Sequence, residues 1–272
     1  MNAKRLCSVL LGGALACGVL YGSAIYSEVR SLRSPRNGPE TPATLGMPFE
    51  RVVIASHDRR LEGCVVHARQ EPEAERAVLI FHGAGENISD WVLPQKLLRA
   101  GGISSMVFDY SGNGDSSGMA TRRNLNEDAR AAYRVFVSQF PKARSRALIG
   151  FSMGNAPLLD ALPELNPPPS RVVLAAAFSS VRDLAHYSFG VPAVLCALLP
   201  DVWNDVEAAR KIRVPALVLH SQDDRSDPIW MGRAIFDAIP NQKQMVTLHG
   251  FRHRDGFLKK EWWAPVISFL GQ

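Results

Sequence analysis

The sequence lacks the features that mark several large classes of protein. Its 272 residues contain only four cysteines, and no group of them has the spacing of a metal site. Lys and Arg are scattered rather than gathered into a basic stripe with interleaved aromatic residues, which argues against nucleic acid as a partner. No internal repeat is visible, and the segment HGAGEN does not have the spacing of a dinucleotide-binding or phosphate-binding loop. We therefore expect no cofactor, no metal ion and no nucleic-acid partner.

What remains is the composition of an ordinary globular protein. Hydrophobic residues make up 46% of the chain and charged residues 21%, which indicates neither disorder nor several membrane spans. The length leaves room for one domain with a sizeable core, and a second independent domain is not expected. The cysteines leave open both the redox compartment and a pairing of Cys64 with Cys196. The oligomeric state is not indicated.

One long apolar run stands at the N-terminus. Residues 6–26 carry no charge, follow two basic residues, and have about the ~20 residues that a helix needs to cross a bilayer. Small residues near the end of the run resemble a signal-peptidase site, so a cleaved signal is the alternative. We favour an uncleaved membrane anchor over residues 1–29. Positive charge flanks both ends of the run and leaves the side of the membrane open.

The next segment has a different composition. Residues 30–48 are rich in Arg, Ser, Pro and Gly, which predicts a linker that acts as a flexible tether. Its basic residues Arg30, Arg33 and Arg36 are placed to contact anionic lipid headgroups, although a solvated linker explains them equally well. We assign residues 49–272 to a single catalytic domain.

In this domain, apolar β-rich runs alternate with helical patterns. The alternation is typical of a mostly parallel sheet with helices on both faces, and the first two runs predict an antiparallel hairpin. Between residues 178 and 210 the pattern is irregular, and short helices there would cover the carboxyl edge of the sheet, where ligands bind in open α/β sheets. The expected strands are 51–56, 63–68, 77–82, 104–109, 147–150, 172–176, 216–220 and 244–249, and the expected helices are 91–100, 123–139, 153–162, 228–239 and 257–270.

The segment from Gly150 to Gly154 reads GFSMG and follows the fifth expected strand. This Gly-x-Ser-x-Gly pattern, between a strand and a helix, is typical of a nucleophile elbow that exposes a serine hydroxyl above a sheet. The glycines are needed because a sharp turn brings the backbone close to neighbouring segments. The pattern alone arises by chance in roughly one chain in ten of this size, as a tight turn containing serine. Its place after a buried strand favours Ser152 as a nucleophile.

A serine hydroxyl needs a base to take its proton and a carboxylate to orient that base. The adjacent Asp223 and Asp224 follow the seventh expected strand, and the spacing does not decide which of them faces a histidine. After the eighth strand, His253 lies in the loop beyond Gly250, whereas His249 ends the strand itself. We therefore prefer His253 as the base. The strand ends converge at one sheet edge, which predicts that serine, acid and histidine meet there.

The oxyanion of an acyl-transfer reaction needs N–H donors that are already in place. One donor in such sites is the amide of the residue after the nucleophile, here Met153. The second comes from the loop after an earlier strand, where Gly83, Ala84 and Gly85 allow close approach of the backbone. We choose Ala84 for this role. A glycine-rich strand exit with no such role is the alternative.

Several motifs, in this order and spacing, resemble the α/β-hydrolase superfamily. They are FHGAGENISDW, FDYSGNGDSSG, IGFSMGN, AFSSVRDLA, KIRVPALVLHSQDDRSDP and GFRHRD, and the likeness runs from about residue 49 to the C-terminus. The sequence resembles in particular the compact branch of membrane-associated hydrolase-domain proteins that are acyl-protein thioesterase-like or lysophospholipase-like. The resemblance implies the α/β-hydrolase fold with an eight-stranded, mostly parallel sheet and a short or minimal cap.

The resemblance also implies roles for residues. In such proteins the acid stands shortly before a proline, which selects Asp224, four residues before Pro228, and the base is the histidine of a glycine-led loop, which is His253. Three positions depart from the branch. Ser221 and Asn155 stand where glycine is common, and Asp227 stands where an apolar residue is common. Asp227 adds charge near the acid, so the substrate preference of the branch is not simply inherited.

These observations predict a serine hydrolase that cleaves carboxylic ester or thioester bonds through an acyl-enzyme on Ser152. The expected substrate is a small ester, an acyl-lipid or an acyl-protein. An amidase or serine peptidase would use the same three residues and is the first alternative. A catalytically silent, membrane-tethered interaction protein is the second alternative.

Overall fold

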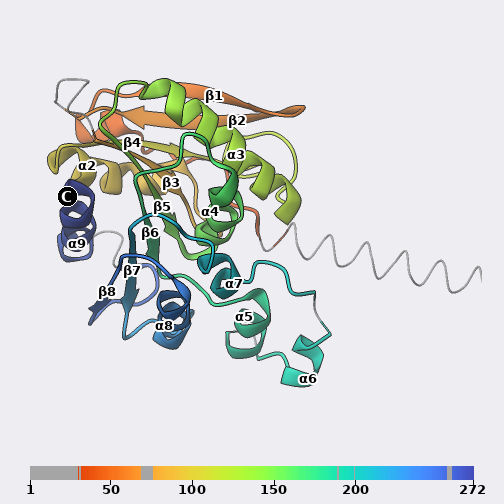
Figure 1. The fold of residues 1–272 in the computed structure, drawn as a ribbon. Helices are drawn as coiled ribbons and strands as arrows, with labels where there is room; N and C mark the ends of the chain where they lie inside the picture. The colour runs from red at the N-terminus through yellow and green to blue at the C-terminus, as the bar shows by residue number, and fades with distance from the viewer. Residues whose placement is uncertain (1–29, 31, 69–75, 189, 199, 256–258) are drawn as a thin grey trace, which may run out of the picture.

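The computed structural model describes residues 30, 32–68, 76–188, 190–198, 200–255 and 259–272 (Figure 1). The predicted anchor, residues 1–29, lies outside the described residues. Among the helices that are described, none is both long and apolar enough to cross a membrane.

Eight strands form one sheet in the order β1-β2-β4-β3-β5-β6-β7-β8. The pairs β1–β2 and β2–β4 are antiparallel and all other pairs are parallel, so the predicted architecture is confirmed. The strands are β1 (Glu50–Ser56), β2 (Arg59–Val66), β3 (Arg76–Phe81), β4 (Ile103–Phe108), β5 (Ser145–Phe151), β6 (Arg171–Ala175), β7 (Ala216–Ser221) and β8 (Lys243–Leu248).

The second strand begins four residues earlier than predicted. Ser56 pairs directly with Arg59, so only two residues form the hairpin loop, and the first of them, His57, has a φ of 55°. Two-residue hairpins favour positive φ because their turns then match the twist of the strands. The polar residues at the start of β2 therefore belong to the strand rather than to a loop.

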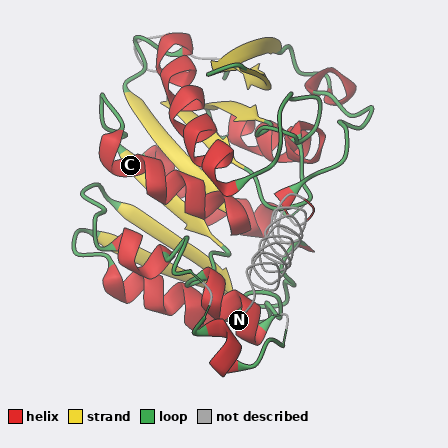
Figure 2. Ribbon diagram, turned by 90° about the vertical axis from the view of Figure 1, so that its right-hand side faces the viewer, coloured by secondary structure: helices red, strands yellow, loops and turns green. Residues whose placement is uncertain are grey.

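Helices cover both faces of the sheet (Figure 2). Residues of α2 and α9 pack in one apolar core, and residues of α3, α4, α7 and α8 pack in the core on the other face. The helices are α2 (Val92–Ala100), α3 (Arg122–Gln139), α4 (Asn155–Ala161), α5 (Val181–Tyr187), α6 (Ala193–Cys196), α7 (Asp205–Ala209), α8 (Ile229–Ala238) and α9 (Lys260–Gly271), and short 3-10 turns are η1 (Pro42–Leu45), η3 (Ile88–Trp91), η4 (Ser152–Gly154) and η5 (Leu162–Glu164).

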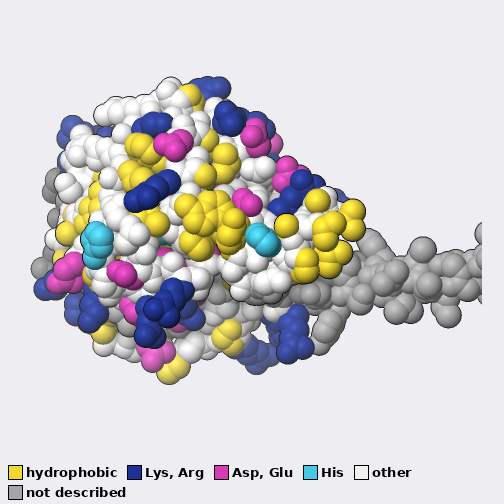
Figure 3. Space-filling view, turned by 90° about the horizontal axis from the view of Figure 1, so that it is seen from below, with side chains coloured by type: hydrophobic (Ala, Val, Ile, Leu, Met, Phe, Trp, Pro, Cys, Tyr) yellow, Lys and Arg dark blue, Asp and Glu magenta, His cyan; other side chains and the backbone are white. Residues whose placement is uncertain are grey.

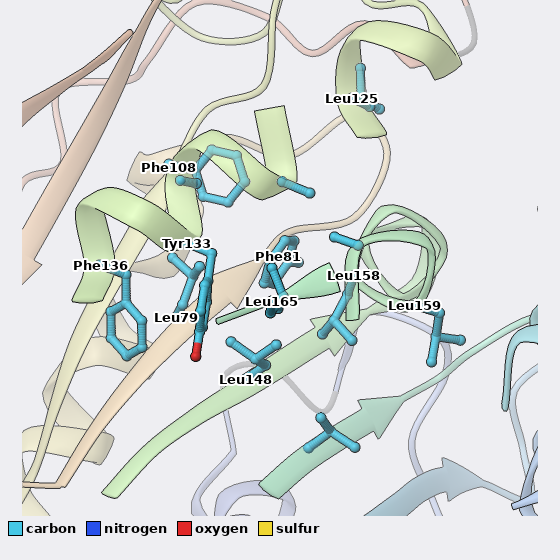
Figure 4. Packing of buried hydrophobic residues seen from close by; sticks show 14 of the residues in the cluster. Leu79, Phe81, Phe108, Leu125, Tyr133, Phe136, Leu148, Leu158, Leu159 and Leu165 are labelled. Atoms are coloured by element: carbon cyan, nitrogen blue, oxygen red, sulfur yellow. The ribbon is translucent and has the colours of Figure 1, made fainter. Parts of the chain in front are cut away.

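The two cores follow from the alternation of side chains along buried strands. In β3, Leu79 and Phe81 face the α3 side, while Val78 and Ile80 face the α2 side. Figure 4 shows the first core, where side chains of the strands meet those of α3 and α4. Because both faces are covered, the strands read in sequence as continuous apolar runs. This packing holds the carboxyl ends of the parallel strands in fixed positions.

Short helices follow β6, as the irregular pattern between residues 178 and 210 predicts. The helices α5 and α6 project from the body in Figure 1, and hydrophobic side chains gather at the surface of the molecule seen from below (Figure 3). The exposed apolar residues of this region include Val194, Leu195 and Leu198. Cys196 and Cys64, whose pairing the sequence left open, are both buried and free.

The segment expected to be a flexible tether contacts the domain. Leu32 is buried in the α3-side core, and the Asn37 side chain donates a hydrogen bond of 2.8 Å to the Asp109 carboxylate. The turn η1 lies next to α2. Composition suggested a solvated segment, but its polar groups find partners in the loops after β3 and β4. The predicted linker, residues 30–48, therefore packs against those loops.

Candidate active site

Ser152 lies at the sharp turn between β5 and α4. Its φ of 49° falls in the left-handed region, which residues other than glycine rarely adopt. A Cβ atom at Gly154 would lie 2.0 Å from the carbonyl oxygen of Phe81, and one at Gly150 would lie 2.9 Å from the Cα atom of Asn155. Only glycine fits at these two positions, so the sequence pattern and the strained turn have the same cause.

A chain of hydrogen bonds starts from the serine hydroxyl. The Nε2 atom of His253 lies 2.9 Å from the Ser152 Oγ, and its Nδ1 atom lies 2.7 Å from an oxygen of Asp224. The other oxygen of Asp224 accepts the backbone amides of Ser226 and Asp227 at 2.9 and 3.0 Å. The structure thus brings together the three residues that the sequence nominated.

The competing residues lie elsewhere. Asp223 is exposed, and its carboxylate accepts the Gly250 amide at 2.6 Å instead of contacting His253. His249 is exposed at the end of β8, so His253 is the histidine that reaches the serine. A bond of 2.6 Å from the Ser221 hydroxyl to the Phe251 carbonyl also holds this loop. Asp223 and Ser221 therefore support the loop that carries His253.

The electrostatics suit a general base. Burial lowers the pKa of His253, but the hydrogen bond to Asp224 and the charges of Asp227 and Asp224 outweigh burial and leave the pKa raised. Burial raises the pKa of Asp224, and the hydrogen bond to His253 overcomes this effect and leaves it lowered. An ionised Asp224 favours the imidazole tautomer with its proton on Nδ1. The Nε2 atom is then free to accept the proton of Ser152.

The turn after β3 packs against the elbow. A Cβ atom at Gly154 would also lie 2.6 Å from the His82 carbonyl oxygen, which shows how closely the two segments approach. Within the described part of the chain, the amide of Ala84 makes no hydrogen bond, and Ala84 lies at the exposed tip of the turn. Met153 directly follows the serine and is buried. These two residues therefore lie on neighbouring segments beside Ser152.

A buried pair that the sequence reasoning missed supports this turn. His82 and Asp109 are both fully buried, with 3.6 Å between the His82 Nε2 and an Asp109 oxygen. Burial lowers the pKa of His82 to about 4, and burial raises the pKa of Asp109 to about 7. The same Asp109 oxygen accepts the Ile88 amide at 2.9 Å. Their positions at the ends of two strands were a signal that could have drawn attention to them.

Glu86 is a third residue that the sequence reasoning missed. Its carboxylate accepts the Gly83 amide at 2.8 Å and the Trp91 indole N–H at 3.2 Å, and it lies 3.6 Å from the guanidinium of Arg254. Burial raises the pKa of Glu86 to about 7. Arg254 follows His253 in the chain, so Glu86 connects the turn after β3 with the histidine loop.

Asn155, where the related branch commonly has glycine, is completely buried behind the elbow. Its side-chain amide donates to the carbonyl oxygens of Ser152 at 2.9 Å and Ala175 at 3.0 Å. These bonds tie the strained turn to the end of β6. Across the described residues, no group of three or more His, Cys, Asp or Glu side chains is arranged to hold a metal ion.

Comparison with known sequences finds one family model and several related proteins. The sequence model of the family described as serine aminopeptidase, S33, matches residues 72–203. An uncharacterized membrane protein of Saccharomyces cerevisiae is 23% identical over 98% of this chain and 97% of its own length. The lysophosphatidylserine lipase ABHD12 of Rattus norvegicus is 29% identical, and the match covers 72% of this chain and 56% of the rat protein.

Solved structures share the fold. An esterase of Pyrococcus furiosus superposes with a TM-score of 0.71 at 19% identity, covering 88% of this chain and 98% of the esterase. An acylaminoacyl peptidase of Pyrococcus horikoshii gives a TM-score of 0.66 at 13% identity, covering 83% of this chain and 41% of the peptidase. Taken with the sheet order, these similarities show that the chain has the α/β-hydrolase fold. The family model and the sequence relatives support its place in that superfamily and a hydrolase activity.

Proposed function

We propose that this chain is a serine hydrolase that cleaves carboxylic ester or thioester bonds in an acyl-lipid, an acyl-protein or a small ester. The observation that carries the proposal is the hydrogen-bonded series of Asp224, His253 and Ser152, with the serine held at positive φ in a glycine-flanked turn. Such a series converts a weak hydroxyl nucleophile into a reactive one.

The first half of the reaction forms an acyl-enzyme. The Nε2 atom of His253 takes the hydroxyl proton of Ser152, and the Oγ atom attacks the carbonyl carbon of the substrate. The imidazolium is stabilised by Asp224, and it then gives the proton to the leaving oxygen or sulfur as the bond to the acyl group breaks. The alcohol or thiol departs, and the acyl group stays on Ser152.

The second half regenerates the enzyme. A water molecule gives a proton to His253 and attacks the acyl carbon, and the proton returns to Ser152 as the free acid leaves. We assign the amides of Met153 and Ala84 as the donors to the oxyanion in both halves. A donor of this kind contributes about 10²–10³-fold to kcat.

The names of the relatives point to two different kinds of scissile bond. The rat relative is named a lysophosphatidylserine lipase and one structural neighbour is an esterase, which supports ester cleavage. The matching family is described as serine aminopeptidase, and another neighbour is an acylaminoacyl peptidase, which favours an amidase or peptidase as the second candidate. Parallel panels of acyl esters, acyl thioesters and aminoacyl amides distinguish the two by their kcat/KM values.

The test of the proposal is the variant Ser152→Ala. We expect fluorophosphonate labelling to disappear and the hydrolysis of p-nitrophenyl acyl esters to fall by at least about 10⁴-fold, because Ser152 supplies the hydroxyl next to the His253 Nε2. The exposed Ser138 on α3 provides the control variant Ser138→Ala, which should keep both signals. Labelling that survives in Ser152→Ala contradicts the assignment. A wild-type protein without labelling or turnover supports the silent interaction protein instead.

We propose further that residues 1–29 anchor the catalytic domain, residues 49–272, to a membrane through the linker at residues 30–48. Support comes from the uncharged run at residues 6–26 and from the name of the yeast relative as a membrane protein. The full chain should remain in the membrane fraction after an alkaline wash, and a variant that lacks residues 1–29 should be released. Release of both proteins contradicts the anchor.

A further inference from the structure

A second carboxylate lies beside the serine and the histidine. Asp227 is only 3% exposed, and one of its oxygens lies 3.7 Å from the Nε2 atom of His253. The Ser152 side chain acts to lower the pKa of Asp227. Asp224 contacts the Nδ1 atom on the opposite edge of the ring. The mechanism above uses Asp224 directly, whereas Asp227 enters it only through a charge that helps to raise the pKa of His253.

The backbone fixes the position of Asp227. Its amide donates to Asp224 at 3.0 Å, and its carbonyl oxygen lies 2.6 Å from the Nε2 atom of His220. His220 is itself confined, because a Cβ atom at Gly232 would lie 2.4 Å from its Nδ1 atom. Pro228 follows and stands at the start of α8. Asp227 is therefore held as firmly as the acid that orients His253.

The surroundings set its charge. Burial raises the pKa of Asp227 to about 6, and Asp224 acts in the same direction, whereas His253 and the Ser152 side chain act to lower the pKa. Asp205 is also buried, and its pKa is raised by burial and by the nearby Asp227. Above a pH of about 6, Asp227 carries a negative charge in a place of low solvent exposure. Charges in such places interact more strongly than they do in water.

The position of the Asp227 carboxylate matters because the leaving group is protonated beside it. To receive its proton, the leaving atom must come within roughly 3 Å of the His253 Nε2. Asp227 lies 3.7 Å from that same nitrogen. Substituents within a few bonds of the leaving atom therefore meet the carboxylate. A negative substituent would be repelled, whereas an ammonium or a hydroxyl group would gain a partner.

Resting on the serine hydrolase function proposed above, we propose that Asp227 determines specificity. It selects substrates whose leaving group carries a positive charge or a hydrogen-bond donor close to the scissile atom. Esters of amino alcohols are the simplest members of this class. Asp227 lies beside the nitrogen that protonates the leaving atom, so the selection concerns the alcohol part of the ester.

A matched pair of substrates tests the proposal. The choline ester and the 3,3-dimethylbutyl ester of one fatty acid have the same shape, but only the first has a charged nitrogen in place of a carbon atom. At a pH well above the pKa of Asp227, the wild-type protein should prefer the choline ester by about tenfold in kcat/KM. In Asp227→Asn this ratio should fall toward about one. The ratio of the two esters is the measurement, because loss of the Asp227 charge also lowers the pKa of His253 and changes the rate on both esters.

Asp223→Asn is the matched control, because Asp223 belongs to the same loop but binds the Gly250 amide. It should keep the preference for the choline ester. Asp227→Ser, a smaller uncharged variant, should repeat the result of Asp227→Asn if the latter folds poorly.

Two outcomes overturn the proposal alone: fluorophosphonate labelling of Ser152 without a choline preference in the wild type, or a preference that persists in both Asp227 variants. A wild-type protein that shows neither labelling nor hydrolysis of either ester overturns the serine hydrolase function, and this inference with it.

Discussion

The two sides of Ser152 are built in different ways. On one side, Asp224 and His253 come from the loops after β7 and β8, and the side chain of Asp224 contacts that of His253, which contacts the serine. On the other side, the turn after β3 offers backbone amides, and buried side chains such as Asp109 and Glu86 hold that backbone in place. On the first side, two side chains carry out the proton transfer. On the second side, several buried side chains hold the backbone, and we call this second set the network.

The network side also extends further along the chain. Asn37 binds Asp109, and the Asn87 side chain donates to the carbonyl oxygens of Pro35 and Arg36 at 3.4 and 3.3 Å. The segment that follows the predicted anchor is thereby connected to the turn beside the serine. The acid–base side is supported by neighbours within its own loops and by the contact of Arg254 with Glu86. A substitution on the acid–base side should therefore act on the reaction itself, whereas one on the network side should act on stability and reaction together.

The largest effect is expected for Asp224→Asn. An asparagine cannot stabilise the imidazolium and favours the wrong tautomer of His253, so kcat should fall by about 10⁴-fold while the protein stays folded. Steady-state kinetics on p-nitrophenyl esters and thermal unfolding measure the two quantities. Asp223→Asn is the control, since its carboxylate only supports the loop, and its kcat should fall by less than about tenfold. Equal losses in the two variants would contradict the difference between these carboxylates.

An intermediate effect is expected for Asp109→Ala. Loss of the carboxylate leaves the Ile88 amide without its acceptor and loosens the turn after β3. We expect kcat to fall by about 10²-fold, as for the loss of one oxyanion donor, and the free energy of unfolding to fall by about 2 kcal/mol. Asp109→Asn keeps one acceptor oxygen and should show smaller losses in both measurements. An unchanged kcat in a destabilised Asp109→Ala protein would show that Asp109 contributes to stability but not to the reaction.

The smallest effect is expected for Asn37→Ala. This change removes one hydrogen bond to Asp109 and should lower the free energy of unfolding by about 1 kcal/mol and kcat by only a few fold. Asn241→Ala removes a comparable bond of 3.2 Å to the Ile212 carbonyl, between the segments before β7 and β8. Denaturant unfolding should show a similar loss for both variants, and kinetics should show a fall in kcat for Asn37→Ala alone. A fall in kcat of the same size in Asn37→Ala and Asn241→Ala would contradict a link between residues 30–48 and the reaction.

The sequence by itself determined the architecture and the elbow. Buried parallel strands are continuous apolar runs, and each is short enough to be recognised without its neighbours. The glycines at 150 and 154 are required by close contacts around the turn, so the pattern that names Ser152 has a local physical cause. The same local reasoning limited the acid to Asp223 or Asp224. It favoured His253 over His249 because only the former lies beyond the strand.

The tertiary structure alone decided which groups meet. Ser152 and His253 are separated by 101 residues, and Asn37 and Asp109 by 72, so no pattern within either segment reports the contact. The resemblance selected Asp224, and the folded loops show that Asp224 faces His253 while Asp223 binds a backbone amide. The buried positions of Glu86 and Asp227 depend on the same packing. The sequence does not show whether a polar residue in a loop is solvated or buried. Its burial depends on the neighbouring loops that pack against it at the sheet edge.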